Sequence, residues 1–272
     1  MIGRRRRRRL WCAAAALTAA WAGGVAPRPL AAQAESAIVA GERVAAAPMR
    51  RPFAVGERLD YDVRFSRLRV GRASMEVASL DTVRGRPAFR TTFRVKGGTW
   101  FYHVEDVLES WIDTTRFQSL RFVQDYEEGG RSHERRYEFF PERQAYRERA
   151  DTSDQPSVLE PLDDGSFLYF VRTLPLEPGR TYEFPRYFRP DRNPVRLRVL
   201  RRERVRVPAG TFDAIVVQPL IKARGVFAEG GEARLWLRDD STRILLQMTS
   251  KLPFGSLNLH LTAERPGVRG GP

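Results

Sequence analysis

The sequence predicts a mainly β protein in which one strongly curved antiparallel sheet forms a partly open barrel or a barrel-like sandwich, with one short helix. After residue 53, apolar and polar residues alternate with a period of two, and turn-forming residues stand where the alternation stops. The pattern gives about eleven or twelve strands joined by short connections. So long an antiparallel series must curl or close, because a flat sheet would leave long unpaired edges.

The alternation is clearest in the C-terminal part of the chain, between Arg202 and Glu264. The strands expected there cover residues 204–207, 212–217, 233–238, 244–248 and 257–261. The turn Pro208-Ala209-Gly210 joins the first two, because Pro fixes φ and Gly tolerates the positive φ of a tight reversal. The run Asp239-Asp240-Ser241-Thr242 joins the next two. This region is therefore expected to be antiparallel sheet with one face in water.

The preceding part of the chain shows the same pattern. Its expected strands cover residues 59–65, 73–77, 89–95, 104–112, 120–126 and 135–140, with an extension at 144–149 and two further strands at 182–187 and 195–200. Gly97-Gly98 is expected to break the alternation after the third strand, because paired glycines permit backbone movement.

One segment departs from the period of two. Apolar residues recur there at helical spacing, at Leu162, Phe167, Leu168, Val171 and Leu174. Asp163 or Asp164 is placed to accept the first free backbone amides, and Pro175 is placed to end the run. The spacing predicts a short helix over residues 164–173 that packs on the sheet.

The first residues have the composition of an export signal. Six arginines, Arg4 to Arg9, precede an apolar run from Leu10 to Ala22, and Ala32-Gln33-Ala34 offers a cleavage site. We therefore expect a signal peptide over residues 1–34, with a retained N-terminal anchor as the alternative. The apolar run of roughly 13 residues is shorter than the ~20 of a spanning helix, and no later run is longer. The expected location is the periplasm or the cell envelope, with no transmembrane span after signal removal.

The expected organisation of the mature chain is simple. Residues 35–52 are rich in alanine, contain Pro48 and Pro52, and are expected to form a flexible lead-in. Residues 53–265 are expected to form a single antiparallel β domain, and residues 266–272 a disordered tail. Cys12 is the only cysteine and lies within the signal, so the mature chain can form neither a disulfide nor a cysteine metal site.

The chain is basic, with a formal net charge of +14. Removal of residues 1–34, which hold seven arginines and no acids, leaves about +7. Arginines stand opposite acids on the strand faces, so we interpret most of the excess as solvated sheet surface. The alternative is attraction to anionic partners at an envelope surface. Nucleic acid is not an expected partner, because no recognition module is present.

Four short motifs resemble an exported bacterial family, the domain of unknown function 3108. The motifs occupy residues 53–61, 70–73, 207–212 and 235–240, and the most specific are Val-Pro-Ala-Gly-Thr-Phe and a Trp strand that ends on paired aspartates. The resemblance implies an envelope protein of antiparallel sheet, akin to the open barrels that carry lipoproteins through the periplasm. It implies no catalytic residues. The high arginine content departs from the family pattern.

The densest aromatic cluster follows Gly97-Gly98. We predict that Trp100, Phe101 and Tyr102 bind ligand, either as the mouth of an apolar pocket or as a platform on which a sugar stacks. The alternative is that these rings are packed in the core.

Polar residues give little support for chemistry. His103, Glu105 and Glu109 share one face of a strand while Asp106 points to the other, which indicates surface polarity rather than a metal site. The aspartates at 239 and 240 could bind calcium but are also ordinary residues of a hairpin turn. No Gly-x-Ser-x-Gly motif is present, and neither His133 nor His260 has an evident nucleophile partner. The sequence therefore predicts no enzyme, metal or cofactor.

Two function classes follow. The first is a noncatalytic carrier whose curved sheet binds an apolar ligand such as a lipid or an acyl chain. The second is an envelope structural or assembly factor that binds another protein or a polysaccharide. A carrier needs an apolar hollow, whereas an assembly factor can have a filled core and an exposed apolar patch.

Overall fold

The structure is a computed structural model that describes residues 51–99, 102–128, 131–149, 151–220, 233–252 and 255–268. The expected signal peptide and all but the last two residues of the expected lead-in lie outside the described residues. From Arg51 onward the chain forms one compact unit. Its described part ends at Val268, whose backbone N–H donates to Val55 O at 2.9 Å.

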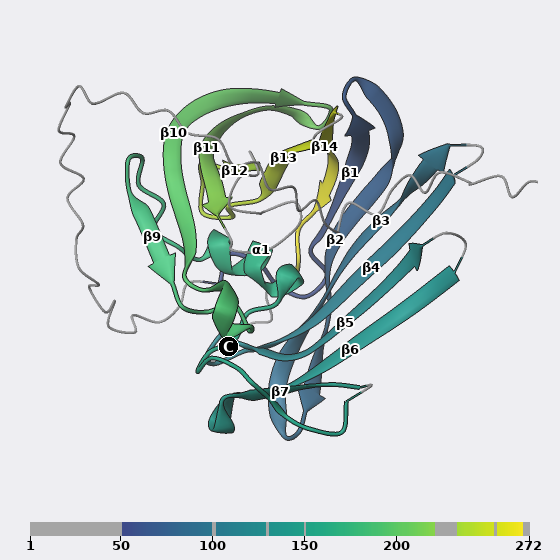
Figure 1. Ribbon diagram of the computed structural model, residues 1–272. Coiled ribbons are helices and arrows are strands. Elements are labelled where there is room, and N and C mark those ends of the chain that lie inside the picture. Colours follow the sequence, from purple (N-terminus) through teal and green to yellow (C-terminus); the bar gives the residue numbers. More distant parts are fainter. Residues whose placement is uncertain are drawn as a thin grey trace, which may run out of the picture. The chain divides into compact units, whose positions relative to one another are not determined.

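Fourteen strands of the described chain form one antiparallel sheet (Figure 1). They are β1 (Arg58–Phe65), β2 (Leu68–Val83), β3 (Arg86–Thr99), β4 (Tyr102–Asp113), β5 (Ser119–Glu128), β6 (Arg131–Phe140), β7 (Ala145–Glu148), β8 (Gln155–Pro156), β9 (Thr181–Phe184), β10 (Val195–Val207), β11 (Gly210–Leu220), β12 (Arg234–Arg238), β13 (Leu245–Leu252) and β14 (Gly255–Arg265). Two short 3₁₀ helices cover Pro141–Arg143 and Pro190–Arg192.

The chain enters this sheet in the middle. From β1 it runs strand by strand to the edge at β8, crosses to the other edge at β9, and returns to pair β14 with β1. The two edge strands, β8 and β9, do not pair, so the curved sheet does not close. This confirms the predicted partly open fold. The fourteen described strands exceed the predicted eleven or twelve. The expected segments 195–200 and 204–207 form one strand, β10, whereas the extension at 144–149 is a strand of its own, β7. β8 was missed because its two residues are too few to show a period.

Helix α1 (Asp164–Arg172) confirms the one helix predicted from the sequence. Asp163 is its N-cap: the side chain accepts hydrogen bonds from the backbone amides of Gly165 and Ser166 at 2.8 and 2.9 Å. The helix packs against β3 and β4, and every residue from Gly165 to Arg172 is buried. A helix buried all round lies inside a core, and in Figure 1 the sheet curves around α1. We call the sheet surface that faces α1 the inner face.

The N-terminal end of α1 is fixed to β4 and β5. Ser110 Oγ and Ser119 Oγ each donate to an Asp163 carboxylate oxygen at 2.6 Å. Burial raises the pKa of Asp163 to about 6, although these hydroxyls and the amides of the first helical turn donate to its oxygens.

The C-terminal end of α1 is fixed to the other side of the sheet. Arg172 forms a bidentate pair with Glu57, just before β1, at 2.7 and 2.9 Å, and both side chains are buried. Arg172 also donates to Thr242 O, in the turn between β12 and β13, at 3.0 Å. Through these contacts α1 is bonded to both halves of the sheet, which the pairing of β1 with β14 also joins.

The interpretation of Gly97-Gly98 as a break was wrong. Both glycines lie within β3 and pair with Val104 and His103 of β4. Gly97 also lies opposite Gly71, and a Cβ added to Gly97 would lie only 2.5 Å from Val70 O. Glycine is therefore required here because the backbones of β2 and β3 approach closely, and not because the strand ends.

The two turns predicted in the C-terminal region are confirmed. Val207 pairs with Gly210 across the β10–β11 turn, and Gly210 has a positive φ of 145°. In the β12–β13 turn, Asp240 Oδ1 accepts from the backbone N–H and the hydroxyl of Thr242 at 2.8 and 2.6 Å. Asp240 is thus held by its own turn, as expected of an Asx motif.

Candidate functional site

The predicted aromatic site lies almost wholly outside the described residues. Trp100 and Phe101 are not described, and Tyr102 is described only as the first backbone position of β4. Thr99 pairs with Tyr102, so the hairpin between β3 and β4 reverses at this point. The assignment of these three residues as ligand-binding therefore stays a prediction.

Several hairpins reverse at the same end of the sheet as this one. Because neighbouring strands are antiparallel, the β1–β2, β3–β4, β5–β6 and β13–β14 hairpins all turn at one end, which we call the hairpin end. In Figure 1 the first three lie at the top and right of the view. Contacts of α1 with Ser110, Ser119 and Thr242 place the helix away from this end.

Near α1 the inner face is fully covered. One row of paired positions crosses β2 to β6 there, and we call it the covered row: Val77, Thr91, Ser110, Phe122 and Tyr137. None of these residues is more than 3% exposed. The core in this part of the sheet is therefore filled by the chain's own side chains.

Two rows nearer the hairpin end lie on the same inner face but are only partly covered. Their paired positions are Met75, Phe93, Leu108, Gln124 and Arg135 in one row and Ala73, Val95, Asp106, Tyr126 and His133 in the next. In both rows the residue on β2 is buried, those on β3 to β5 are half-buried, and the residue on β6 is exposed. We call the positions on β3 to β6 in these two rows the open face.

The open face is apolar on one side and polar on the other. Phe93, Val95 and Leu108 pack by part of their surface against the core. Toward β6, the Tyr126 ring stacks on His133 with 5.2 Å between centroids, and the Arg135 guanidinium lies 5.8 Å from the Tyr126 ring. This arrangement offers apolar contact beside hydrogen-bond donors, which suits an amphiphilic ligand.

Asp106 contributes an acidic group to the open face. Burial raises the pKa of its carboxyl above the ordinary value. The sequence pattern correctly placed Asp106 on the face opposite Glu105, but it did not indicate that the Asp106 side would be the inner one.

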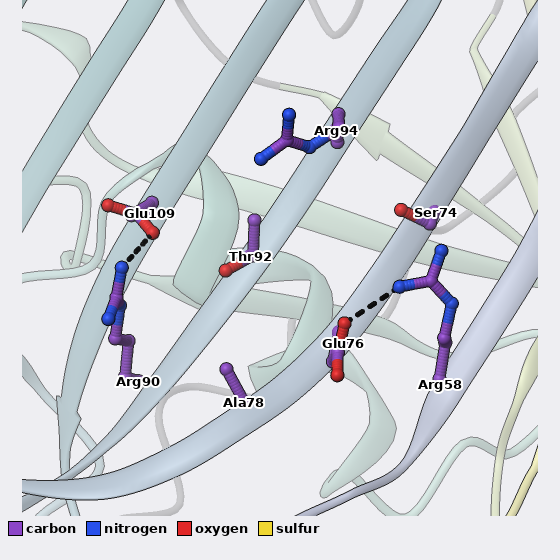
Figure 2. A pocket seen from close by; sticks show the side chains of 8 residues that line it. All are labelled: Arg58, Ser74, Glu76, Ala78, Arg90, Thr92, Arg94 and Glu109. Carbon is purple, nitrogen blue, oxygen red and sulfur yellow. Dashed lines mark hydrogen bonds and ion pairs between the residues drawn. The ribbon is translucent and has the colours of Figure 1, made fainter.

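A second candidate site is a groove on the outer face of β1 to β4 (Figure 2). It has a volume of about 390 Å³ and is lined by Arg58, Ser74, Glu76, Ala78, Arg90, Thr92, Arg94 and Glu109. Three short side chains form its floor, and five long charged ones surround them. Ala78 contributes to the hollow because it is a β-bulge residue: Val77 pairs with Thr91 and Ser79 with Arg90, which leaves Ala78 unpaired.

Ion pairs hold the walls of the groove. Arg58 contacts Glu76 at 2.8 Å and Arg90 contacts Glu109 at 2.5 Å, as drawn in Figure 2. Arg94 contacts Glu105, outside the groove, at 3.2 Å. Each guanidinium keeps further N–H donors, so the groove presents donors, acceptors and hydroxyls together. Such a surface can hydrogen-bond a polyhydroxylated ligand.

The buried group of Asp163, Ser110, Ser119 and Ser166 combines a carboxylate with hydroxyls, as hydrolytic sites do. Its geometry indicates a structural role instead. Ser166 Oγ accepts from the Asp163 backbone N–H at 2.9 Å and completes a capping box. All four side chains are buried and bonded to one another or to the backbone, so none is presented to a substrate.

The acidic residues that could suggest a metal site are engaged by cations. Glu105 contacts both Arg94 and Lys96 at 3.2 Å, and the His103 side chain lies outside the described residues. Across the described ranges, no group of three or more His, Cys, Asp or Glu side chains could hold a metal ion. Burial, and after it the Arg64 guanidinium, lowers the pKa of His260.

Sequence reasoning missed both the open face and the groove. Each strand's alternation is visible in the sequence, but the rows depend on how strands pair, and bulges shift that register at Ala78 and at Leu120. A usable signal existed for the groove. Small residues, Ser74, Ala78 and Thr92, alternate with the long charged residues of β2 and β3.

Within the described ranges, no helix has the length and apolar character needed to span a membrane. The family model DUF3108, described as a protein of unknown function, matches residues 60–262. No curated protein matches the sequence significantly.

One solved structure is similar in fold, and a second matches with a lower score. One is a β-barrel-like protein of the domain of unknown function DUF1849 from Brucella abortus, with 10% identity and a TM-score of 0.52 over 79% of this chain and 98% of that chain. The other is a candidate lipoprotein from Parabacteroides distasonis, with 10% identity and a TM-score of 0.35 over 80% of this chain and 100% of that chain. The first comparison supports the curved, unclosed sheet.

Proposed function

The chain belongs to the DUF3108 family of proteins of unknown function, and we propose that it is an exported, noncatalytic envelope protein that binds an apolar or lipid-like ligand on the open face. The observation that carries this proposal is the change along the inner face. Its side chains are fully buried beside α1, whereas Phe93, Val95 and Leu108 are left half-exposed toward the hairpin end.

The chemistry of the open face supports an amphiphile. Half-exposed apolar side chains lose contact with water when a hydrocarbon chain covers them, which is worth about 25 cal/mol per Å² of apolar surface. Gln124, Tyr126 and Arg135 then stand on the β5–β6 side, where a polar head would find hydrogen-bond donors. The ligand would thus lie across β3 and β4 with its polar end toward β6.

Export is supported by the sequence of the first 34 residues. N-terminal sequencing of the mature protein is expected to begin at or near Glu35. The noncatalytic part of the proposal is supported by the state of the Ser–Asp group at α1, which is buried and bonded within the fold.

The test is uptake of a fluorescent fatty acid by the purified protein. Leu108→Asn places a polar group on the open face and is expected to weaken binding at least tenfold. Val107→Asn is the matched control, because Val107 is the neighbouring half-buried residue of β4 on the outer face. Equal binding by both variants and the unchanged protein would rule out the open face.

The predicted aromatic residues enter the same assay. If Trp100 and Phe101 form the mouth of the ligand site, replacing both with Ala is expected to abolish uptake while the far-UV circular dichroism is retained. Loss of the fold would assign them to the core instead, because truncating a buried aromatic residue costs about 3–5 kcal/mol. Tyr102, the next residue along the chain, is replaced singly by Ala and measured in the same uptake assay.

The outer groove favours a second candidate function, that of an envelope factor that binds polysaccharide. Its mixed donors and acceptors and its volume of about 390 Å³ suit a short sugar segment. Thr92→Tyr would fill the floor of the groove without touching the inner face. Loss of binding to purified envelope polysaccharide, with fatty-acid uptake unchanged, would support this function over the first.

A further inference from the structure

The tip of the β1–β2 hairpin exposes an apolar side chain. β1 ends at Phe65 and β2 begins at Leu68, and these two residues pair across the turn Ser66-Arg67. Leu68 is 72% exposed, the most exposed large apolar side chain in any described strand. Both neighbours of Leu68 along the chain, Arg67 and Arg69, are exposed as well.

The tip is held in place by the adjacent strand. The Ser66 backbone N–H donates to Ser256 O of β14 at 2.7 Å. Asn258 Nδ2, also on β14, donates to Ser66 O at 3.4 Å. The sheet therefore presents Leu68 on a fixed hairpin.

Cations on the β1–β2 hairpin and on the adjoining part of β3 outnumber the acids that contact them. The cations are Arg64, Arg67, Arg69 and Arg72 on the β1–β2 hairpin, with Arg94 and Lys96 on β3, where Lys96 pairs with Arg72. Within the described residues, two acids contact them. Asp62 contacts Arg69 at 2.9 Å and Arg64 at 3.9 Å, and Glu105 contacts both Arg94 and Lys96.

Two of these arginines, Arg67 and Arg72, differ from the other four cations. Across the described part of the chain, no Asp or Glu lies in ion-pair distance of Arg67 or Arg72. Among the described side chains these six cations contact two acids, which leaves an excess of four positive charges on the hairpin and the adjoining part of β3. We call the set Arg64, Arg67, Leu68, Arg69, Arg72, Arg94 and Lys96 the basic tip.

We propose that the basic tip docks the protein on an anionic lipid bilayer. Guanidinium groups match phosphate oxygens in geometry and form paired hydrogen bonds with them. A lipid surface also provides an apolar layer just beneath its phosphates, where the Leu68 side chain would insert. A soluble polyanion offers the charge but no apolar phase, so the combination of exposed leucine and unpaired arginines favours the bilayer.

This surface is separate from the proposed ligand site but lies at the same end of the molecule. Phe93 and Val95 face the inner side of β3, whereas Arg94 and Lys96 alternate with them on the outer side. If both assignments hold, docking would bring the open face near the membrane from which an amphiphile is taken or to which it is delivered. Each assignment is tested by a different measurement.

The experiment is co-sedimentation of the processed protein, purified after export, with lipid vesicles. One preparation is phosphatidylcholine alone, and in the other roughly a third of the lipid is phosphatidylglycerol. Binding is expected only to the anionic vesicles and is expected to fall as salt rises. The variant R67E/R72E is expected to lose at least tenfold in affinity. Leu68→Ser is expected to lose several-fold while the salt dependence remains.

The matched control is R204E/R206E, which changes the net charge by the same amount. Both arginines are exposed and lie beside the β10–β11 turn, at the opposite end of the sheet. Equal losses in the two double variants would overturn the proposal by reducing it to net charge. Equal binding to neutral and anionic vesicles would overturn it too. So would full competition by dextran sulfate against anionic vesicles together with unchanged vesicle binding by Leu68→Ser.

Fatty-acid uptake by R67E/R72E in the absence of vesicles separates this proposal from the proposed function. Unchanged uptake with lost vesicle binding supports docking by the basic tip. If Leu108→Asn loses fatty-acid uptake but binds vesicles normally, the two sites act independently.

Discussion

The covered row and the open face occupy the same strands and differ in what lies opposite. Phe122 and Tyr126 both lie on the inner face of β5, four residues apart, yet Phe122 is 1% exposed and Tyr126 is half-buried. Asp163, the N-cap of α1, contacts Ser110, the β4 partner of Phe122, and Phe188 packs on Tyr137, its partner on β6. Tyr126 lies two rows nearer the hairpin end. An inward position on a curved sheet is therefore core only where another element covers it.

The cover itself depends on a few polar contacts. Asp163 fixes one end of α1 to Ser110 and Ser119, and Arg172 fixes the other end to Glu57 and Thr242. Buried polar groups are costly unless they are fully bonded, so these contacts define where the helix can sit. They also determine how much of the inner face remains open.

The largest expected effect comes from truncating one aromatic residue in each region. Phe122→Ala is expected to lower the free energy of unfolding by about 3–5 kcal/mol, because it leaves a cavity in the buried core. Tyr126→Ala on the same strand is expected to cost about 1 kcal/mol, because the ring is already half in water. Urea unfolding of both variants measures the difference. Similar losses would mean that the open face is covered in solution.

A loss of unfolding free energy of similar size is expected when the contact that holds the C-terminal end of α1 is removed. Arg172→Met leaves the Glu57 carboxylate buried without its partner, which costs about 3–5 kcal/mol. The control is Arg180→Met, which removes an exposed pair with Glu177 and is expected to cost less than about 1 kcal/mol. Equal costs would contradict the role of Arg172 in holding α1.

The pH dependence of stability gives a smaller effect. The pKa of Asp163 is raised to about 6 in the folded protein, above its ordinary value of 3.8, so the folded state binds this proton more tightly. The stabilising contribution is therefore present below about pH 4 and is lost as pH rises through about 6.

The comparison of the unchanged protein with Asp163→Asn isolates that contribution. Asn keeps a side-chain oxygen for the N-cap but cannot titrate. The difference in unfolding free energy between the two proteins is expected to change by on the order of 2 kcal/mol between pH 4 and 7. A difference that does not vary with pH would show that the carboxyl stays charged in both states.

The sequence was sufficient for the strands, the helix and most turns because these depend on local patterns. Asp163 as an N-cap and Gly210 at a reversal are examples, since each is set by its own segment. Gly97 was misread because its requirement comes from Gly71 on the neighbouring strand, which no local pattern reveals. The same limit applies to both candidate sites.

The open face could not be predicted for a further reason. Val95 and Leu108 have the same alternation as covered residues of the same strands, and only the position of α1 distinguishes them. The groove in turn depends on the bulge at Ala78, which shifts the pairing of β2 with β3. Long-range packing, not strand propensity, decides where the inner face remains accessible.

Photo-crosslinking with a fatty acid that carries a diazirine on its hydrocarbon chain tests most directly whether the open face binds a ligand. Peptide mapping by mass spectrometry would locate the label on the purified protein. A ligand on the open face is expected to label Phe93, Val95 and Leu108, in competition with unlabelled fatty acid, and not to label Phe122. Labelling confined to the outer face, or no labelling that competes, would contradict a ligand site on the open face.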